Sequence, residues 1–93
     1  MRNLPESVAQ SNDVILTEMS DGTGVLLHMR TKFYYTLNES GVFLWKSLSG
    51  GAKRSPDALA TSLCEEFEVD LDAARSDVSR VLEELLDEDL VHS

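Results

Sequence analysis

The first half of the chain alternates apolar and polar positions with the two-residue period of β-strands. Residues 13–19, "DVILTEM", and residues 25–29, "VLLHM", both show this period and are predicted to be strands. The Asp21-Gly22 pair between them favours a two-residue hairpin loop. We therefore predict a hairpin here, with His28 facing solvent from its second strand.

A third strand is predicted at residues 33–36, "FYYT", after a short polar turn. Aromatic and β-branched side chains favour the half-buried surface of a sheet. A meander is the simplest arrangement of three consecutive strands, and it places the strand that runs from Phe33 to Leu37 at an edge. The free N–H and C=O groups of an edge strand are a hazard unless something covers or uses them.

Beyond the third strand the period changes from two to 3.6 residues, which predicts three helices. Asn38 and Ser55 are good N-caps, the second precedes a proline, and the third helix begins near Asp70. Gly50-Gly51 is predicted to end the first helix. The apolar stripes of the three helices are Gly41, Leu44, Trp45 and Leu48, then Leu59, Leu63 and Phe67, then Ala74, Val78, Val81, Leu82, Leu85 and Leu86.

Strands followed by helices predict an α+β domain of the order βββααα. The length of 93 residues gives room for one domain with one modest core. We expect residues 1–93 to form that single domain, with about twelve flexible residues at the N-terminus. Leu90 and Val91 are expected to return the tail to the core.

Charge is distributed unevenly along the chain and narrows the choice of partner. Residues 1–56 carry six basic and five acidic residues, whereas residues 57–93 carry two basic and twelve acidic ones. Three helices with a sheet can form a winged helix, but a DNA-binding protein needs a basic footprint. We therefore expect no nucleic acid partner.

A membrane partner is also not expected. The acidic half of the chain would be repelled by an anionic membrane surface. No apolar run approaches the roughly 20 residues that cross a bilayer. Because the N-terminus lacks the features of a secretion signal, we expect a cytoplasmic location.

The residues that usually carry catalysis are sparse. Cys64 is the only cysteine, and two histidines, His28 and His92, are too few for a metal site without an unusual carboxylate set. Ser40 lies in "NESGV", which is not a nucleophile elbow. The clustered carboxylates fit solvated helix ends better than a converging acid and base. We expect no enzymatic activity, no metal and no cofactor.

Peptide binding at the open sheet edge remains as a candidate function, because an added strand would satisfy the free main-chain groups. The last helix has a wider apolar stripe than a small sheet needs, and part of it could wall a groove beside the edge. A purely structural interpretation stays open from the pattern alone. In that interpretation Phe33 and Tyr35 are core aromatics and Tyr34 is an ordinary surface residue.

Three segments of the chain together resemble the PqqD-like family, also called the RiPP precursor-peptide recognition element. They are "GVLLHMRTKFYYTLNESGVFLWKSLSGG", "ALATSLCEEFEVD" and "ARSDVSRVLEELLDEDLV". The resemblance covers roughly residues 13–91 and depends on the order and spacing of landmarks such as Leu37-Asn38, Gly41 and Trp45. It implies a winged-helix-like domain with a three-stranded antiparallel sheet and three helices.

The resemblance also implies a function. Members of the family are not enzymes; they bind the leader segment of a ribosomally made precursor peptide as an extra strand and present it to a separate processing enzyme. The implied peptide-binding residues are Phe33, Tyr34, Tyr35 and Thr36 on the strand, and Ala74, Arg75, Asp77, Val78, Val81, Leu82 and Leu85 on the third helix. Spacing leaves open which of these helix residues face the groove and which face the core.

Within the family, the turn "RTKFYY" followed by "LN..G" looks most like the stand-alone leader-binding proteins of lasso-peptide clusters, whose partner is a leader peptidase. Proteins of the pyrroloquinoline quinone pathway usually carry "LL.PE" where this chain has "LLHMRTKFYY". A PqqD-type chaperone for that quinone, or for another radical-SAM-modified peptide, is the alternative.

Overall fold

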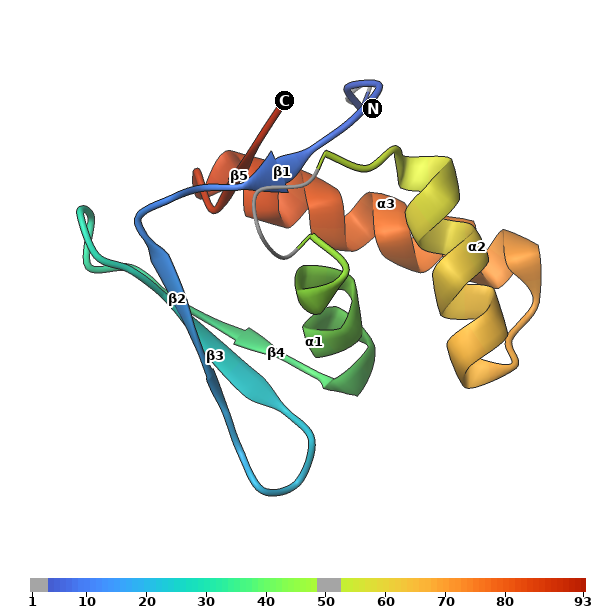
Figure 1. The fold of residues 1–93 in the computed structure, drawn as a ribbon, viewed down its shortest axis with the longest axis horizontal. Helices are drawn as coiled ribbons and strands as arrows, with labels where there is room; N and C mark the ends of the chain where they lie inside the picture. The colour runs from blue at the N-terminus through green and yellow to red at the C-terminus, as the bar shows by residue number, and fades with distance from the viewer. Residues whose placement is uncertain (1–3, 49–52) are drawn as a thin grey trace.

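The computed structural model describes residues 4–48 and 53–93. Its strands are β1 (Ala9–Gln10), β2 (Val14–Glu18), β3 (Gly24–His28), β4 (Tyr34–Leu37) and β5 (Val91–His92), and its helices are α1 (Glu39–Lys46), α2 (Pro56–Phe67) and α3 (Leu71–Asp87). Figure 1 shows the β2-β3-β4 sheet on one side of the molecule, α2 on the other side and α1 between them. The predicted α+β class is confirmed.

The three predicted strands form the expected antiparallel meander, with β3 at its centre. The loop between β2 and β3 differs from the predicted two-residue turn. The Met19 N–H donates to the Thr23 carbonyl at 2.8 Å, so three residues make the loop. The last of them, Gly22, lies at a φ of 91°, where only glycine avoids a steric cost.

The helices begin where the capping residues predict. Asn38 Oδ1 accepts a hydrogen bond from the Gly41 N–H at 2.9 Å, and Ser55 Oγ accepts one from the Ala58 N–H at 3.1 Å. Asp70 also precedes α3, but its side chain makes no capping bond. The predicted helix end at Gly50-Gly51 lies outside the described residues.

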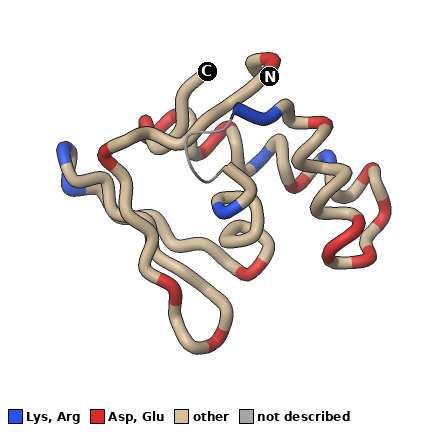
Figure 2. Tube along the Cα trace, in the orientation of Figure 1, with Lys and Arg blue, Asp and Glu red and all other residues tan. Residues whose placement is uncertain are grey.

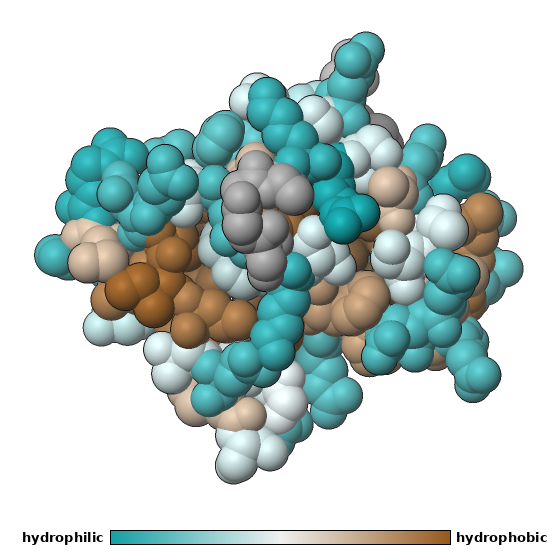
Figure 3. All heavy atoms as spheres, in the orientation of Figure 1, coloured by the Kyte–Doolittle hydropathy of each residue, from teal (hydrophilic) through white to brown (hydrophobic). Residues whose placement is uncertain are grey.

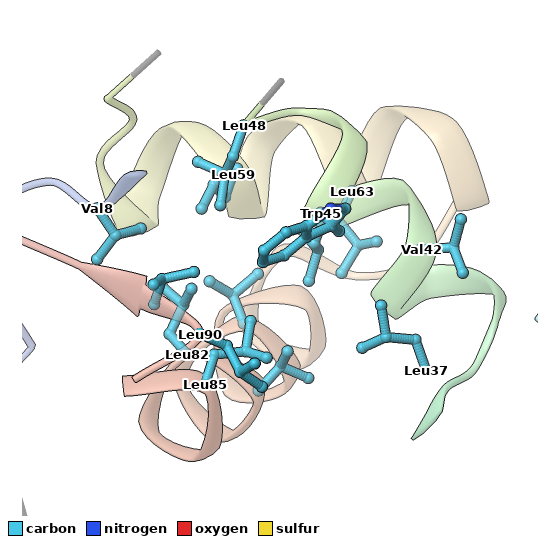
Figure 4. Close-up of a cluster of buried hydrophobic side chains, with 14 of the residues drawn as sticks. Val8, Leu37, Val42, Trp45, Leu48, Leu59, Leu63, Leu82, Leu85 and Leu90 are labelled. Atoms are coloured by element: carbon cyan, nitrogen blue, oxygen red, sulfur yellow. The ribbon is translucent and has the colours of Figure 1, made fainter. Parts of the chain in front are cut away.

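The core joins the three helices to the inner face of the sheet. Its centre includes Leu44 and Trp45 of α1, Leu59 and Leu63 of α2 and the stripe of α3. Figure 4 shows Trp45, Leu63, Leu82 and Leu85 among the side chains of this cluster. Burial of a leucine side chain contributes about 1.5–3 kcal/mol, so this cluster supplies most of the stability. Leu90 is buried in it as expected.

The segment before β2 packs against the rest of the domain from Val8 onward, while the flexibility expected for the N-terminus stays a prediction. Val8 is fully buried, and its N–H donates to the Arg54 carbonyl at 2.8 Å. β1 then pairs antiparallel with β5, with Gln10 opposite Val91. Figure 1 shows these two strands side by side beyond the end of α3. A strand of two residues is too short for alternation to indicate it, which is why the sequence did not predict this pair.

His28 is buried, so the prediction that it faces solvent is wrong. It lies on the inner face of β3 with Gly24 and Leu26, and its exposed fraction is 0%. Burial of the imidazole is possible there because Nδ1 accepts hydrogen bonds from the N–H groups of Arg30 and Thr31 in the next turn. This local bonding offsets part of the cost of burying a polar ring.

Within residues 4–48 and 53–93, no helix combines the length and the apolar character that crossing a membrane requires.

We predict that truncating Val8 to alanine lowers the free energy of unfolding by about 1–3 kcal/mol, since it leaves a cavity among buried side chains. Urea denaturation followed by circular dichroism measures this change. Glu6→Ala is the matched control, because Glu6 is exposed in the same segment and its loss should leave the midpoint unchanged. Equal midpoints for wild type and Val8→Ala would mean that the segment contributes no packing.

Candidate functional site

β4 has one paired side and one free side. It pairs with β3, and the described residues place no strand beyond it in the sheet. The His28 N–H donates to the Phe33 carbonyl at 2.9 Å, which fixes the alternation of the ladder. The main-chain groups of Phe33 and Tyr35 therefore point to β3, and those of Tyr34 and Thr36 point to the free edge.

A hollow of about 330 Å³ lies between β4, the start of α1 and α3. Its lining comes from Tyr35, Thr36 and Leu37 of β4, from Asn38 and Gly41 at the start of α1, and from Arg80 and Val81 of α3. The lining combines the apolar Leu37 and Val81, which are almost fully buried, with the polar Thr36, Asn38 and Arg80. An extended chain that paired with the edge of β4 would lie beside this hollow.

The start of α1 holds the end of β4 in place. Leu37 is almost fully buried, and Gly41 lies directly against it. A Cβ atom on Gly41 would approach Leu37 Cδ2 to 2.9 Å, so only glycine allows α1 to lie this close to the strand. Gly41 thus serves the close packing of α1 against the end of β4.

Tyr35 and Glu84 connect β4 to α3 across the groove between them. The Tyr35 hydroxyl donates a hydrogen bond to Glu84 Oε2. Burial, together with the bond to Glu84 and its charge, raises the pKa of Tyr35 to about 12. Tyr35 is thus held in its protonated, hydrogen-bond-donating form.

Arg80 continues this polar line along α3. Its guanidinium lies 3.8 Å from Glu84 Oε1 and 3.6 Å from Asp77 Oδ1. These three side chains, four and three positions apart, stand on one face of the helix. They are about half exposed, so the ion pairs contribute little to stability and leave the groups accessible.

Of the predicted site residues, Tyr35, Thr36 and Val81 lie together at the hollow. Tyr34 is 66% exposed, on the opposite face of the sheet from Tyr35. Arg75 lies elsewhere on α3, where its Nε is 3.7 Å from Asp57 Oδ1 of α2.

Four of the predicted groove residues belong to the core instead. Their exposed fractions are 0–1%, which leaves them no surface to offer to a partner. They are Ala74, Val78, Leu82 and Leu85. Arg80 and Glu84 were not among the predicted site residues, although their position beside the apolar stripe is the signal of a groove rim.

The outer face of the sheet is unusually apolar for a surface. Ile15, Met29 and Tyr34 are all about half exposed or more. Figure 3 shows hydrophobic side chains gathered over the β2-β3 part of the molecule. Figure 2 shows basic residues at the turn between β3 and β4, and acidic residues clustered around the connection between α2 and α3.

A protein-family model matches residues 23–91, and its description is coenzyme PQQ synthesis protein D (PqqD). The match includes the whole of β4, the hollow and α3. The chain therefore belongs to the PqqD family. A search of curated proteins gave no match.

Two solved structures share the fold. One is TbiB1 in complex with the TbiA(beta) leader peptide, with 27% identity and a TM-score of 0.77 over 91% of this chain and 95% of that chain. The other is lasso peptide synthetase B1 complexed with the leader peptide, with 23% identity and a TM-score of 0.73 over 92% of this chain and 98% of that chain.

We predict that the stability supplied by Tyr35 is lost at alkaline pH. Its pKa rises from 10 in the unfolded chain to about 12 in the folded one, so the unfolded state releases the proton first. The contribution is therefore complete below pH 10 and disappears as the pH rises towards 12. Urea denaturation of wild type and Tyr35→Phe across this range should show a larger decline in the wild type than in the variant, which shares every other group that titrates there.

Tyr34→Phe provides the matched control, because it removes the neighbouring phenol and leaves the bond to Glu84 in place. The phenolate absorbance of this variant should rise with a midpoint near 12. A midpoint at the ordinary value near 10 would contradict the hydrogen bond across the groove.

Proposed function

We propose that this protein is a stand-alone, non-catalytic recognition element that binds the leader segment of a ribosomally made precursor peptide. The leader pairs with β4 as an extra strand, and the protein presents the precursor to a separate processing enzyme. A lasso-peptide leader peptidase is the partner that we propose. The observation that carries this function is the free edge of β4 beside the hollow of α3.

The free main-chain N–H and C=O groups of Tyr34 and Thr36 form hydrogen bonds with the guest strand and so fix its register. Each added hydrogen bond contributes about 0.5–1.5 kcal/mol net, because the same groups are otherwise bonded to water. Two residues of free edge therefore do not give tight binding alone. Apolar side chains of the guest must add to them, at about 1.5–3 kcal/mol for each fully buried one.

The hollow gives the site its selectivity for side chains. Successive residues of a strand point to opposite faces, so alternate guest residues would point toward α3. Val81 and Leu37 form the apolar base that such a side chain would contact. Arg80 lines the hollow and Asp77 lies 3.6 Å from its guanidinium, so these two charged side chains would meet polar parts of the guest.

The acidic helices argue against DNA as the partner. A winged helix that binds DNA places a basic helix in the groove, whereas α3 carries mainly acidic charge. The proposal includes a cytoplasmic location, since the free thiol of Cys64 suits a reducing compartment.

A PqqD-type chaperone for pyrroloquinoline quinone, or for another radical-SAM-modified peptide, is the second candidate. The description of the matching family model favours it. Both candidates use the same edge, so the neighbouring genes decide between them. A peptidase beside a cyclase would support the lasso-peptide pathway, and a radical enzyme would support the alternative.

Proline substitutions in β4 test the edge. The ligand for this test is a peptide that is selected from a displayed random library for binding to the wild-type protein. Tyr34→Pro and Thr36→Pro each remove a free main-chain donor without touching the ladder to β3. We expect each to weaken binding about tenfold or more, which corresponds to about 1.4 kcal/mol. Isothermal titration calorimetry measures the affinity, and circular dichroism verifies the fold.

Glu18→Pro is the matched control on the other edge of the sheet. The Met29 N–H donates to the Asp13 carbonyl, so alternation leaves the main chain of Glu18 free as well. Binding should be unchanged in this variant. Equal losses at both edges, or full affinity in Tyr34→Pro and Thr36→Pro, would count against strand addition at β4.

The non-catalytic role predicts that the purified protein leaves the selected peptide and any cognate precursor intact. Mass spectrometry after long incubation at equimolar protein should show no cleavage and no change in mass. Turnover that persists through further purification and disappears in Tyr35→Phe would contradict the adaptor role, because it would assign chemistry to the groove.

A further inference from the structure

His28 occupies an unusual position beside the candidate site. It is fully buried at the end of β3, one residue before the turn that leads into β4. Its Nδ1 accepts hydrogen bonds from the N–H groups of Arg30 at 3.3 Å and Thr31 at 3.4 Å. A neutral imidazole carries one hydrogen, so these bonds place that hydrogen on Nε2.

The Nε2–H group points toward the end of α3. It is buried and has no hydrogen-bond partner among the described residues. The carboxylate of Asp89 lies 3.5 Å away, and the Arg30 guanidinium donates to the same oxygen at 2.8 Å. Arg30 also lies 3.5 Å from Asp13. Asp89 therefore stands between the buried imidazole and a guanidinium from the turn.

This cluster lies where the turn between β3 and β4 meets the end of α3. β4 runs antiparallel to α3, because Tyr35 bonds to Glu84 while Leu37, later in β4, lines the hollow with Arg80 and Val81, earlier in α3. Asp89, just beyond α3, accordingly lies at the end where β4 begins. The contacts of His28 and Arg30 with Asp89 join the end of β3 and the turn that precedes β4 to the residues just after α3. The bond of Tyr35 is the second tie, and the hollow opens beyond it.

Backbone strain is concentrated at the same place. Three non-glycine residues of the described chain have a positive φ, and two of them, Lys32 and Asp89, belong to this cluster. The Lys32 N–H donates to the His28 carbonyl at 2.7 Å. Such conformations are unfavourable and persist only where the surroundings determine them strongly. The turn and the helix end are thus both held in fixed, costly shapes around His28.

We propose that His28, together with Asp89 and Arg30, is a positioning residue for the peptide site. It fixes the start of β4 against the end of α3, and so sets the width of the groove without touching the guest. This role depends on the proposed function, but the geometry of the cluster does not. Removing the cluster therefore weakens peptide binding by more than the loss of stability explains.

The first test concerns the ring itself and needs no peptide. The ¹⁵N chemical shifts of the His28 ring in solution should show that Nδ1 is unprotonated and that Nε2 carries the hydrogen. The amides of Arg30 and Thr31 should exchange slowly in the wild type and in His28→Asn, whose side-chain oxygen stands near the place of Nδ1. They should exchange fast in His28→Leu. A hydrogen on Nδ1 would overturn the proposal.

The second test measures affinity for the peptide selected by display on the wild type. His28→Leu and Asp89→Asn should each weaken binding about tenfold, and asparagine tolerates the positive φ of Asp89. His28→Asn keeps an acceptor for the N–H groups of the turn but lacks the Nε2–H group that faces Asp89. We therefore expect its affinity to lie between those of the wild type and His28→Leu. The salt bridge of Arg30 to Asp89 is exposed, so its loss in Asp89→Asn should barely change stability.

Ala60→Gly is the matched control for destabilisation alone. Ala60 is buried on α2, outside the groove, so this variant lowers stability without moving β4. Affinity should stay at the wild-type value as long as the protein is folded. Equal weakening by Ala60→Gly, or full affinity in His28→Leu and Asp89→Asn, would overturn the positioning role. If the wild type selects no peptide, the proposed function fails, and the ring measurement still decides the geometry.

Discussion

The packing of the apolar stripe of α3 into the helical core is the constraint on which the site depends. Ala74, Val78, Leu82 and Leu85 are enclosed by side chains of α1 and α2, so α3 cannot turn about its axis without exposing them. This fixed orientation directs Arg80, Val81 and Glu84 toward β4. The groove is thus a consequence of how the core is filled, although the core residues do not themselves line it.

The strand and the helix on the two sides of the groove are connected by polar contacts. Tyr35 bonds to Glu84 in the middle, and Asp89 meets His28 and Arg30 at one end. Hydrogen bonds hold two elements at a set distance without filling the space between them, whereas apolar packing would close that space. This arrangement explains how so small a domain keeps an open hollow beside a rigid sheet edge.

Local sequence signals were sufficient for most of the fold. The caps at Asn38 and Ser55, the meander and the third helix follow from neighbouring residues, and they agree with the structure. The pairing of β1 with β5 did not follow, because it joins residues from opposite ends of the chain. The burial of His28 did not follow either, since it depends on N–H groups that only the folded turn presents. Spacing identified the stripe of α3 but could not divide it between core and groove.

The alternation of β4 assigns two tasks of the proposed function to different groups. Main-chain groups at the free edge would hold a guest strand, and side chains at the hollow would determine which guest is bound. The free main-chain groups belong to Tyr34 and Thr36, so pairing with a guest strand does not depend on the identity of their side chains, provided that proline is avoided. The Tyr34 side chain lies on the opposite face of the sheet from Tyr35, whereas Thr36 also lines the hollow. An engineer who wished to redirect the protein to a new peptide would leave the edge alone and redesign only Val81, Arg80 and their neighbours. In the proposed function, the main-chain edge would hold any extended guest strand, and the side chains at the rim of α3 would select among guests.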